Sequence, residues 1–271
     1  MPSWVISGVS KGLGFSFLQN LSEDPANTIF GLVRDKAAVE AKVAAEIGRD
    51  NIHIIQADTT DPVALQAAAQ EISEKTGGSV DYVIANAALQ AKTALVGLDV
   101  LGRDPAALEQ DLVDHFRVNA VGPVHLFTAF LPLVLKSDIK KMIAISSGMG
   151  DPEMTIQADI YHATAYAMSK AALNMAIAKF SAVYREEGVL CMAICPGAVD
   201  SGSLNIETEE EGQLAMKMFG KFKQYAPTFE SPMSPDTSAK AVLKLVNKAT
   251  VDSGKYAGQF MSRKESKPYL P

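Results

Sequence analysis

The feature that most constrains the fold is a regular alternation of short apolar runs with longer amphipathic stretches. The runs are rich in Val, Ile and Ala and do not alternate apolar with polar residues, which is typical of strands covered by helices on both faces. Seven runs are predicted as strands, at residues 3–7, 28–33, 52–57, 82–86, 142–146, 189–195 and 256–261. Strands that alternate with helices form a parallel sheet with right-handed crossovers. The pattern predicts one α/β domain over residues 1–271, with a doubly wound sheet.

Helix starts are marked by capping signals. Asp61, Asp104 and Ser234 each precede a proline, which is the pattern of an N-cap followed by the first helical residue. Thr208 and Glu211 have the spacing of a capping box. Two long connections, residues 89–103 and 200–232, should leave the carboxyl ends of strands, where ligands bind in such sheets. We expect a substrate loop at the first and a lid with a helical middle at the second.

Charge and cysteine usage exclude several classes of protein. The chain has 25 Lys and Arg against 31 Asp and Glu, with no basic stripe for a nucleic-acid backbone. Its most apolar stretch, residues 126–135, is shorter than the ~20 residues that span a bilayer. Cys191 and Cys195 lie four apart on one predicted strand, ~13 Å along it, whereas a disulfide needs Cα atoms within ~7 Å. Two free thiols suit a reducing compartment, so we expect a cytoplasmic protein with no nucleic-acid or membrane partner.

A glycine-rich turn follows the first strand. Gly8, Gly12 and Gly14 are spaced so that backbone N–H groups can approach a pyrophosphate at the start of a helix, although an ordinary tight turn has the same residues. At the end of the second strand, Arg34 stands where a basic residue accepts a 2′-phosphate, and Lys11 can reach the same corner. These cations predict NADPH. Arg34 as a solvated loop residue is the alternative, and the adjacent Asp35 leaves NADH open.

Tyr166 and Lys170 lie four residues apart on one face of a predicted helix. A phenol titrates near ~10, and a neighbouring ammonium can lower its pKa by ~1–3 units, which makes a general acid or base. Such a pair is an ordinary surface pair on most helices. Here, however, other polar residues end neighbouring strands or interrupt a helix: Ser146-Ser147, Asn86-Ala87-Ala88, Asn119 and Cys195-Pro196-Gly197.

In this order, together with Asp58, these motifs resemble those of the short-chain dehydrogenase/reductase family over nearly the whole chain. The segment 166–175 is similar to fungal and secondary-metabolism members. The resemblance implies a Rossmann sheet of strand order 3-2-1-4-5-6-7 and a tetrad of Asn119, Ser147, Tyr166 and Lys170. In it Tyr166 donates the proton, Lys170 binds the nicotinamide ribose and lowers the phenol pKa, Ser147 orients the substrate and Asn119 holds a relay water. Ser147 is preferred to Ser146 because the family's serine is second in such a pair.

The resemblance also implies the cofactor contacts of an NADP-dependent reductase and no metal. The residues expected to bind NADPH are Gly8, Ser10, Lys11, Gly12, Leu13, Gly14, Arg34, Asp58, Thr59, Asn86, Ala87, Tyr166, Lys170, Pro196, Gly197, Val199 and Ser201. Ala88 departs from the family's Asn-Ala-Gly, and Ser201 stands in place of a threonine. The interval from Ser147 to Tyr166 is several residues longer than usual, and residues 149–161 are predicted as an extra substrate loop.

The predicted substrate is a bulky, largely apolar ketone or aldehyde, or the matching alcohol. The residues expected to bind it are Met149, Met154, Tyr161, Leu204, Met216 and Phe219, because methionines adapt to irregular apolar shapes. The lid methionines could instead pack only within the protein, and His162 is expected at the surface. The rival functions are a non-redox isomerase, dehydratase or cyclase and an NADPH-sensing regulator. The family's usual pairing of the helices that contain Asn119 and residues 166–184 predicts a homodimer or homotetramer.

Overall fold

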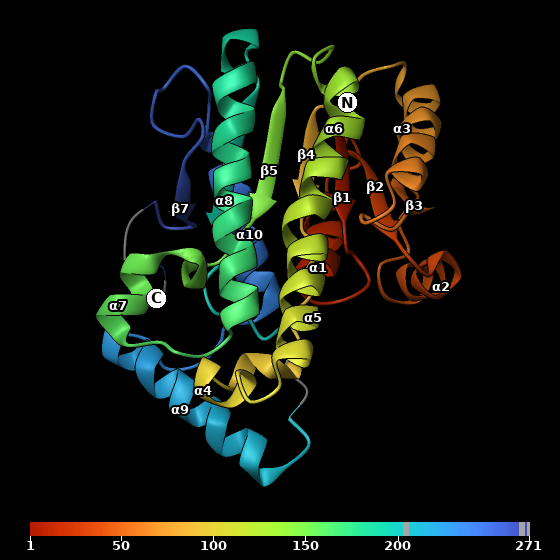
Figure 1. The fold of residues 1–271 in the computed structure, drawn as a ribbon. Coiled ribbons are helices and arrows are strands. Elements are labelled where there is room, and N and C mark those ends of the chain that lie inside the picture. Colours follow the sequence, from red (N-terminus) through yellow and green to blue (C-terminus); the bar gives the residue numbers. More distant parts are fainter. Residues whose placement is uncertain (203–205, 266–268, 270–271) are drawn as a thin grey trace.

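Seven parallel strands form the centre of the molecule in the order β3-β2-β1-β4-β5-β6-β7, as predicted (Figure 1). The computed structural model of the protein describes residues 1–202, 206–265 and 269. The strands are β1 Ser3–Ser7, β2 Thr28–Val33, β3 Ile52–Gln56, β4 Tyr82–Ala85, β5 Lys141–Ile145, β6 Leu190–Cys195 and β7 Phe260–Ser262. Because the order reverses direction between β1 and β4, the carboxyl ends of these strands flank the crevice where such sheets bind ligands.

Six of the predicted strands match the observed ones to within one residue at each end. The seventh prediction, residues 256–261, is wrong over its first four residues. Gly258 has φ +74° and turns the chain there, and its N–H donates to the carbonyl oxygen of Cys191 at 2.8 Å. The strand therefore begins only at Phe260, whose partner on β6 is Ala193.

Helices cover both faces of the sheet (Figure 1). Their buried side chains form one apolar core with α1 Gly12–Leu21, α2 Lys36–Glu46 and α10 Pro235–Lys248. The opposite core includes α3 Pro62–Thr76, α6 Gly122–Val134 and α8 Thr164–Tyr184. In front of the sheet, a π-helical turn, η2 Arg117–Val121, joins α5 Pro105–Phe116 to α6. A short 3-10 turn, η4 Arg185–Glu187, follows α8.

The predicted caps are confirmed. Asp61 and Asp104 accept backbone N–H groups at the starts of α3 and α5, and Ser234 does so at the start of α10. Thr208 and Glu211 form both hydrogen bonds of a capping box at the start of α9 Glu209–Tyr225. These side chains satisfy first-turn N–H groups that lack helical partners, so the sequence marks helix starts accurately here.

The sequence predicted that the most apolar stretch is too short to span a bilayer, and the helix that contains this stretch is longer than expected. Because η2 continues α5 into α6, residues Pro105–Val134 form one helical stretch of 30 residues, long and apolar enough by length and composition to span a bilayer. Of the most apolar 18 residues of this helix, 56% is buried inside the protein. The helix residues Leu126, Phe127 and Phe130 have 0% exposure. Its buried side packs in the core between α3 and α8, as in a core helix of a folded domain.

A third apolar cluster lies beyond the carboxyl ends of the strands, at the bottom of Figure 1. It is built around α7 Pro152–Ala158 and α9, beside the short elements η1 Lys92–Leu95, α4 Leu98–Leu101 and η3 Gly148–Gly150. The prediction of a loop at residues 149–161 is therefore wrong. Asp151 caps α7 by accepting from the Glu153 N–H at 2.9 Å, and Pro152 stands at its first position, so the segment is helical.

Candidate active site

A cavity of about 1030 Å³ opens at the carboxyl edge of the sheet, between the strand ends and α9. Residues after β1, β2, β3, β4, β5 and β6 all line it, because every strand points the same way. The glycine turn and the Ser147–Tyr166 region both line this cavity. It is large enough to hold a dinucleotide together with a small-molecule substrate.

The glycine turn brings two backbone segments into close contact. Gly8 and Gly12 have φ of +72° and +57°, which side chains with a Cβ rarely adopt. A Cβ on Gly14 would lie 2.2 Å from the Gly8 carbonyl oxygen, so α1 can approach the turn only with glycine there. Gly8, Ser10, Lys11, Leu13 and Gly14 line the cavity, whereas Gly12 packs against Ser201. The start of α1 thus faces the cavity, which fits a pyrophosphate.

Asn86 fixes this turn from β4. Its side-chain amide donates to the carbonyl oxygens of Ser7 and Gly8, both at 3.0 Å. Asn86, Ala87 and Ala88 all line the cavity. The amide therefore ties the ends of two neighbouring strands together, and the residues predicted to flank the cofactor are side by side.

The corner expected to bind adenosine carries cations. Lys11 and Arg34 both line the cavity, and the Lys11 ammonium donates to the Gly202 carbonyl oxygen at 2.9 Å. The carboxylate of Asp35 accepts from the Ala38 N–H at 3.1 Å as the N-cap of α2. Asp35, the residue that left NADH open, thus caps a helix start, while Lys11 and Arg34 contribute positive charge to the cavity.

The third strand contributes Asp58 and Thr59 to the cavity, as expected. One Asp58 oxygen accepts from the N–H and the hydroxyl of Thr60, at 2.8 and 2.9 Å. Thr59 is buried against the start of α6, where a Cβ on Gly122 would lie 3.0 Å from its hydroxyl oxygen. These contacts hold the turn after β3 rigidly at the cavity edge.

The two serines after β5 have different partners. The Ser146 hydroxyl donates to the side-chain oxygen of Asn174 on α8 at 2.6 Å. The Ser147 hydroxyl instead hydrogen-bonds the phenol of Tyr166 and accepts from the Met149 N–H at 3.2 Å. Ser147 is thus the serine that faces Tyr166, on the geometry as well as on the resemblance.

Lys170 lies one helical turn from Tyr166, and its side chain is buried, whereas that of Tyr166 is partly buried. The Lys170 ammonium donates to the Ile145 carbonyl oxygen at 2.9 Å and lies 5.6 Å from the centre of the Tyr166 ring. Burial raises the pKa of Tyr166 to about 12, against a lowering by the Ser147 hydrogen bond. Burial also lowers the pKa of Lys170 to about 8. The predicted lowering of the phenol pKa by Lys170 is wrong for the protein alone, because desolvation of the phenolate dominates.

Asn119 is fully buried in the π turn, and its side chain is occupied by protein groups. Its oxygen accepts from the Leu89 N–H at 2.7 Å, and its amide donates to the Leu89 carbonyl and the Ser169 hydroxyl, both at 2.9 Å. Ser169 in turn donates to the Tyr166 carbonyl at 2.7 Å. The side chain therefore links α8 to the substrate loop. That Asn119 also holds a relay water stays a prediction.

Two further residues of the same helix face hold this loop. The Ala91 N–H donates to His115 Nε2 at 3.4 Å, and the Thr93 hydroxyl donates to Asp111 at 3.1 Å. His115 Nδ1 contacts the Asp111 carbonyl and carboxylate, at 2.9 and 3.1 Å. Successive turns of the helix thus bind alternate residues of the loop: Asp111, His115 and Asn119 bind Thr93, Ala91 and Leu89. Nothing in the linear spacing of these six residues indicates the pairing.

The segment after β6 follows its predicted course. Pro196, Gly197, Val199 and Ser201 all line the cavity, and Gly197 has φ +85°. Val199 pairs with Met233 in a short parallel bridge. This backbone lies opposite the Tyr166 region and leads into α9, which covers the cavity. α9 is fastened to η1 by Lys92, whose ammonium is 2.7 Å from Glu207 and 3.2 Å from Glu211.

The predicted substrate residues divide into three groups. Met149, Met154 and Phe219 line the cavity. Met216 is 74% exposed on the outer side of α9, and Tyr161 is 47% exposed and stacks on His162, so neither lines the cavity. Leu204 lies outside the described residues. His162, expected at the surface, is only 2% exposed.

Sequence reasoning missed several lining residues, among them four of the third apolar cluster. Met218 and Phe222 face the cavity four residues apart on α9, a spacing that a helical-face argument could have found. Cys195 lies at the end of β6, where burial raises its pKa and its sulfur accepts from the Gly148 N–H at 3.2 Å. Tyr269 comes from near the C-terminus, and no local pattern points to it. All four line the apolar part of the cavity beside Tyr166.

Comparisons with known proteins agree with this geometry. A family model described as short chain dehydrogenase matches residues 3–212. Short chain dehydrogenase virK of Hypocrea virens is 46% identical over 272 residues, and short-chain dehydrogenase/reductase AacuF of Aspergillus aculeatus is 40% identical over 271, each covering 100% of both chains. NADPH-bound carbonyl reductase from chicken fatty liver superimposes with a TM-score of 0.76 at 24% identity, over 98% of each chain, which is a likeness of fold. The resemblance to fungal members is thus confirmed.

Proposed function

This chain belongs to the short-chain dehydrogenase family, and from that membership we propose that it interconverts a carbonyl group and an alcohol on an apolar small molecule, with NADPH as its cofactor. The observation that carries the proposal is the contact of Ser147 with the Tyr166 phenol beside Lys170, inside a cavity that also contains the glycine turn. An NADPH-bound relative of the same fold supports the choice of cofactor.

The cavity fits the cofactor in a way that its own residues explain. The close packing at Gly14 leaves no room for a Cβ and turns the start of α1 toward the cavity. Lys11 and Arg34 supply positive charge for a 2′-phosphate. Asn86, Thr59 and the backbone after Pro196 would flank the remainder, with Lys170 at the ribose. When bound, NADPH supplies the hydride.

The protein's own groups then supply the proton to the carbonyl oxygen. A pKa of about 12 keeps Tyr166 protonated at neutral pH, so it can donate to a carbonyl oxygen that becomes an alkoxide. Ser147, hydrogen-bonded to the phenol, donates to the same oxygen and orients it. The Lys170 ammonium stabilises the phenolate that remains. We assign the π turn at Asn119 to the path that returns a proton to Tyr166.

The apolar lining supports a bulky substrate with little charge. Met149, Met154, Met218, Phe219 and Phe222 surround the space next to Tyr166, and flexible methionines accept irregular apolar shapes. Both cysteines are free and buried, which supports our proposal that the protein works in the cytoplasm. We further propose that it assembles as a homodimer or homotetramer.

The test is turnover of ketones and aldehydes by the purified protein with NADPH, followed by loss of NADPH absorbance. We expect Tyr166→Phe to lower kcat by ~10²–10⁴-fold, because it removes the proton donor and little else. A protein that turns over no carbonyl, or a Tyr166→Phe variant as active as the wild type, contradicts the proposal. Formation of a product without net consumption of NADPH would identify an isomerase, dehydratase or cyclase instead.

A further inference from the structure

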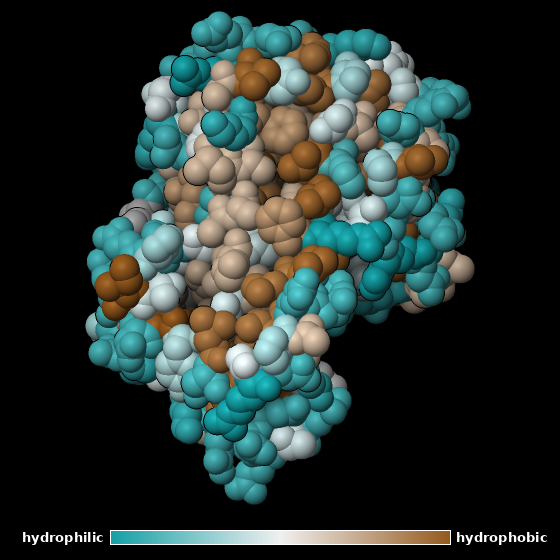
Figure 2. All heavy atoms as spheres, viewed as in Figure 1, coloured by the Kyte–Doolittle hydropathy of each residue, from teal (hydrophilic) through white to brown (hydrophobic). Residues whose placement is uncertain are grey.

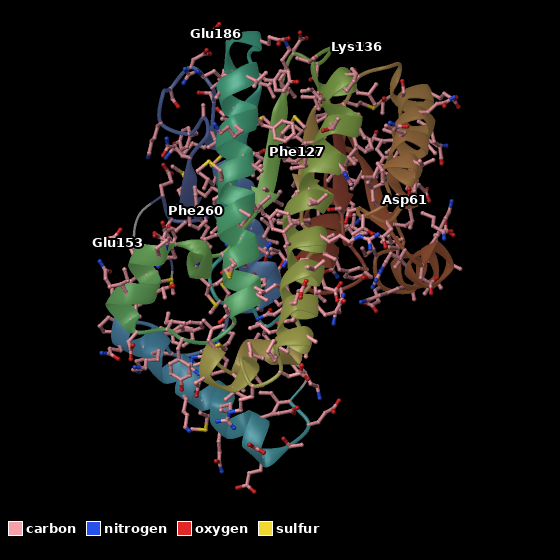
Figure 3. All side chains as sticks on the ribbon, in the orientation of Figure 1. Asp61, Phe127, Lys136, Glu153, Glu186 and Phe260 are labelled. Atoms are coloured by element: carbon pink, nitrogen blue, oxygen red, sulfur yellow. The ribbon has the colours of Figure 1, made fainter. Side chains whose placement is uncertain are left out.

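Tyr269 is a buried aromatic residue that the mechanism above does not use. Its side chain is 4% exposed and lines the same cavity as Tyr166. Although Tyr269 lies near the C-terminus in the sequence, its hydroxyl reaches Asp151, the N-cap of α7. Figure 3 labels Phe260 of β7, on which Tyr269 stacks, and Glu153 of α7, which follows Asp151 and Pro152 at the helix start.

Two separate contacts fix the position of the ring. Tyr269 stacks on Phe260 of β7, with ring centres 4.8 Å apart and an interplanar angle of 21°. Its hydroxyl donates to Asp151 Oδ2 at 2.8 Å. The other oxygen of Asp151 accepts from the Glu153 N–H at 2.9 Å and caps α7. One carboxylate thus orients the extra helix and the tyrosine together.

The ring stands beside the residues that hold the reacting carbonyl. Gly148 directly follows Ser147, and a Cβ on Gly148 would lie 2.7 Å from the Tyr269 Cβ and 2.8 Å from the Met154 sulfur. The Cys195 sulfur lies 3.9 Å from the Tyr269 carbonyl oxygen. A carbonyl held between Ser147 and Tyr166 therefore directs one of its substituents toward Tyr269 and Met154.

We propose that Tyr269 is a specificity-determining residue, an aromatic wall that limits the size of the substituent on the Ser147 side of the carbonyl, and that Asp151 is its positioning residue. The neighbouring side chains of Met149, Met154 and Phe222 are apolar, so the substituent that fits is an apolar, ring-bearing group. This inference rests on the proposed carbonyl chemistry, and it identifies the part of the substrate whose size Tyr269 limits.

The experiment compares two ketones that differ by one fused ring, acetophenone and 2-acetylnaphthalene. We expect Tyr269→Ala to raise the ratio of kcat/KM for the larger ketone over the smaller by about tenfold or more, because size discrimination by one or two carbon atoms already reaches ~10–200-fold. Affinity for NADPH, measured by fluorescence, should not change. Tyr269→Leu replaces Tyr269→Ala if the alanine variant does not fold.

A double-mutant cycle tests whether Asp151 acts on substrate size selection through its hydrogen bond to Tyr269. Tyr269→Phe keeps the ring but loses the hydrogen bond, and Asp151→Ser keeps a capping residue but is too short to reach Tyr269. Both should shift the ratio in the same direction, less than Tyr269→Ala, and the double variant should shift it no further than either alone. Glu153→Gln, on the same helix turn, is the matched control and should leave the ratio unchanged.

An unchanged ratio in the folded Tyr269→Ala or Tyr269→Leu variant overturns the proposal. If the wild type reduces neither ketone, the proposed reductase activity fails for these substrates. Calorimetry then measures the binding of the same two ketones in the presence of NADP⁺, which tests the role of Tyr269 independently of turnover. A changed ratio of Kd values then supports it, and an unchanged ratio overturns it. Absence of binding to every variant overturns both proposals.

Discussion

Lys170 is a lysine buried almost completely, at 2% exposure, with its ammonium donating to the Ile145 carbonyl oxygen. Burial holds its pKa at about 8, below the usual 10.5. Since the unfolded chain keeps the proton more tightly, the charged lysine destabilises the fold below pH 8. That penalty falls as pH rises from 8 to 10.5, where the unfolded lysine also becomes neutral.

We therefore expect Lys170→Met to abolish carbonyl reduction and yet to stabilise the cofactor-free protein at pH 7. The gain in the free energy of unfolding should be on the order of 1–3 kcal/mol, from the size of the pKa shift. Chemical denaturation at pH 7 and pH 10 measures it, and the difference between variant and wild type should shrink at the higher pH. A variant less stable than the wild type at pH 7 would contradict this account.

Arg34 is the residue that we propose to favour NADPH over NADH. It lines the cavity, while the carboxylate of Asp35 caps α2. We expect Arg34→Ala to raise the KM for NADPH by roughly 10–100-fold, the loss of one charge-assisted hydrogen bond to phosphate, with little change for NADH. Lys36→Ala, an exposed lysine of the same turn, is the control. Equal losses for both cofactors would show that Arg34 has only a structural role.

At this scale the sequence located the reacting groups but not their energetics. Tyr166, Lys170 and Ser147 are set by short-range spacing and by strand ends, which a linear pattern records. The pKa of Tyr166 depends on burial contributed by the whole fold, and the sequence argument considered only its neighbour Lys170. Tyr269 reaches the cavity over a separation of more than one hundred residues from Asp151, which no local pattern encodes.

At the scale of elements, the sequence predicted where helices begin but not which side of a helix faces the cavity. The caps at Asp61, Asp104 and Ser234 are local signals, and they are confirmed. α9 was expected, but Met216 was assigned to its inner face although Met218 and Phe222 face the cavity. The segment that forms α7 was expected as a loop because the interval from Ser147 to Tyr166 is long. Short helices depend on tertiary packing more than on propensity. Here that packing comes from α9 and Tyr269.

The row of Asp111, His115 and Asn119 makes the α5–η2 helix the support of the substrate loop. Because the Ala91 N–H donates to His115 Nε2, His115→Ala leaves that N–H without its acceptor and opens a gap under the loop. We expect a loss of about 1–3 kcal/mol in the free energy of unfolding, the cost of an unsatisfied buried donor, and a higher KM for ketones. Denaturation and steady-state kinetics measure the two effects.

Gln110→Ala is the matched control for this row, since Gln110 is exposed on the same helix and its side-chain amide donates to Asp114 at 3.0 Å. It should change neither stability nor KM. A His115→Ala variant with wild-type stability and KM would show that the row does not support the loop, and that Asn119 alone positions it.

At the scale of the molecule, the strand order places every chemical group at one edge. Since β1 and β4 are neighbours and the chain reverses its direction of winding between them, the ends of β1, β4, β5 and β6 lie together. The alternating pattern predicted a doubly wound parallel sheet, because parallel crossovers leave few topologies, and the family resemblance implied its strand order. The third apolar cluster was not predicted, since its buried parts come from five separate segments, at Ala94, 149–163, Cys195, 218–229 and Tyr269. That one domain spans residues 1–271 stays a prediction.

The outer face of the two front helices carries the last prediction. Figure 2 shows apolar side chains gathered over α8 and the α5–α6 helix, bordered by hydrophilic ones. Among the exposed apolar residues of α5 and α8 are Phe116 at 51% and Met175 at 61%. The helical stretch Pro105–Val134 is long and apolar enough to span a bilayer, yet only 56% of its most apolar 18 residues is buried. The apolar surface that remains is one that a second copy of the chain would cover, as the resemblance implies.

We expect the protein to sediment as a dimer or tetramer at micromolar concentration, and Phe116→Glu or Met175→Glu to shift it toward the monomer. A charge at the centre of a closed apolar interface must be desolvated without a partner, which costs several kcal/mol. Ile156→Glu, at a residue 79% exposed on α7, introduces the same charge away from this face and should leave the assembly intact. A monomeric wild type, or glutamate variants that stay assembled, would place the contact elsewhere or exclude it.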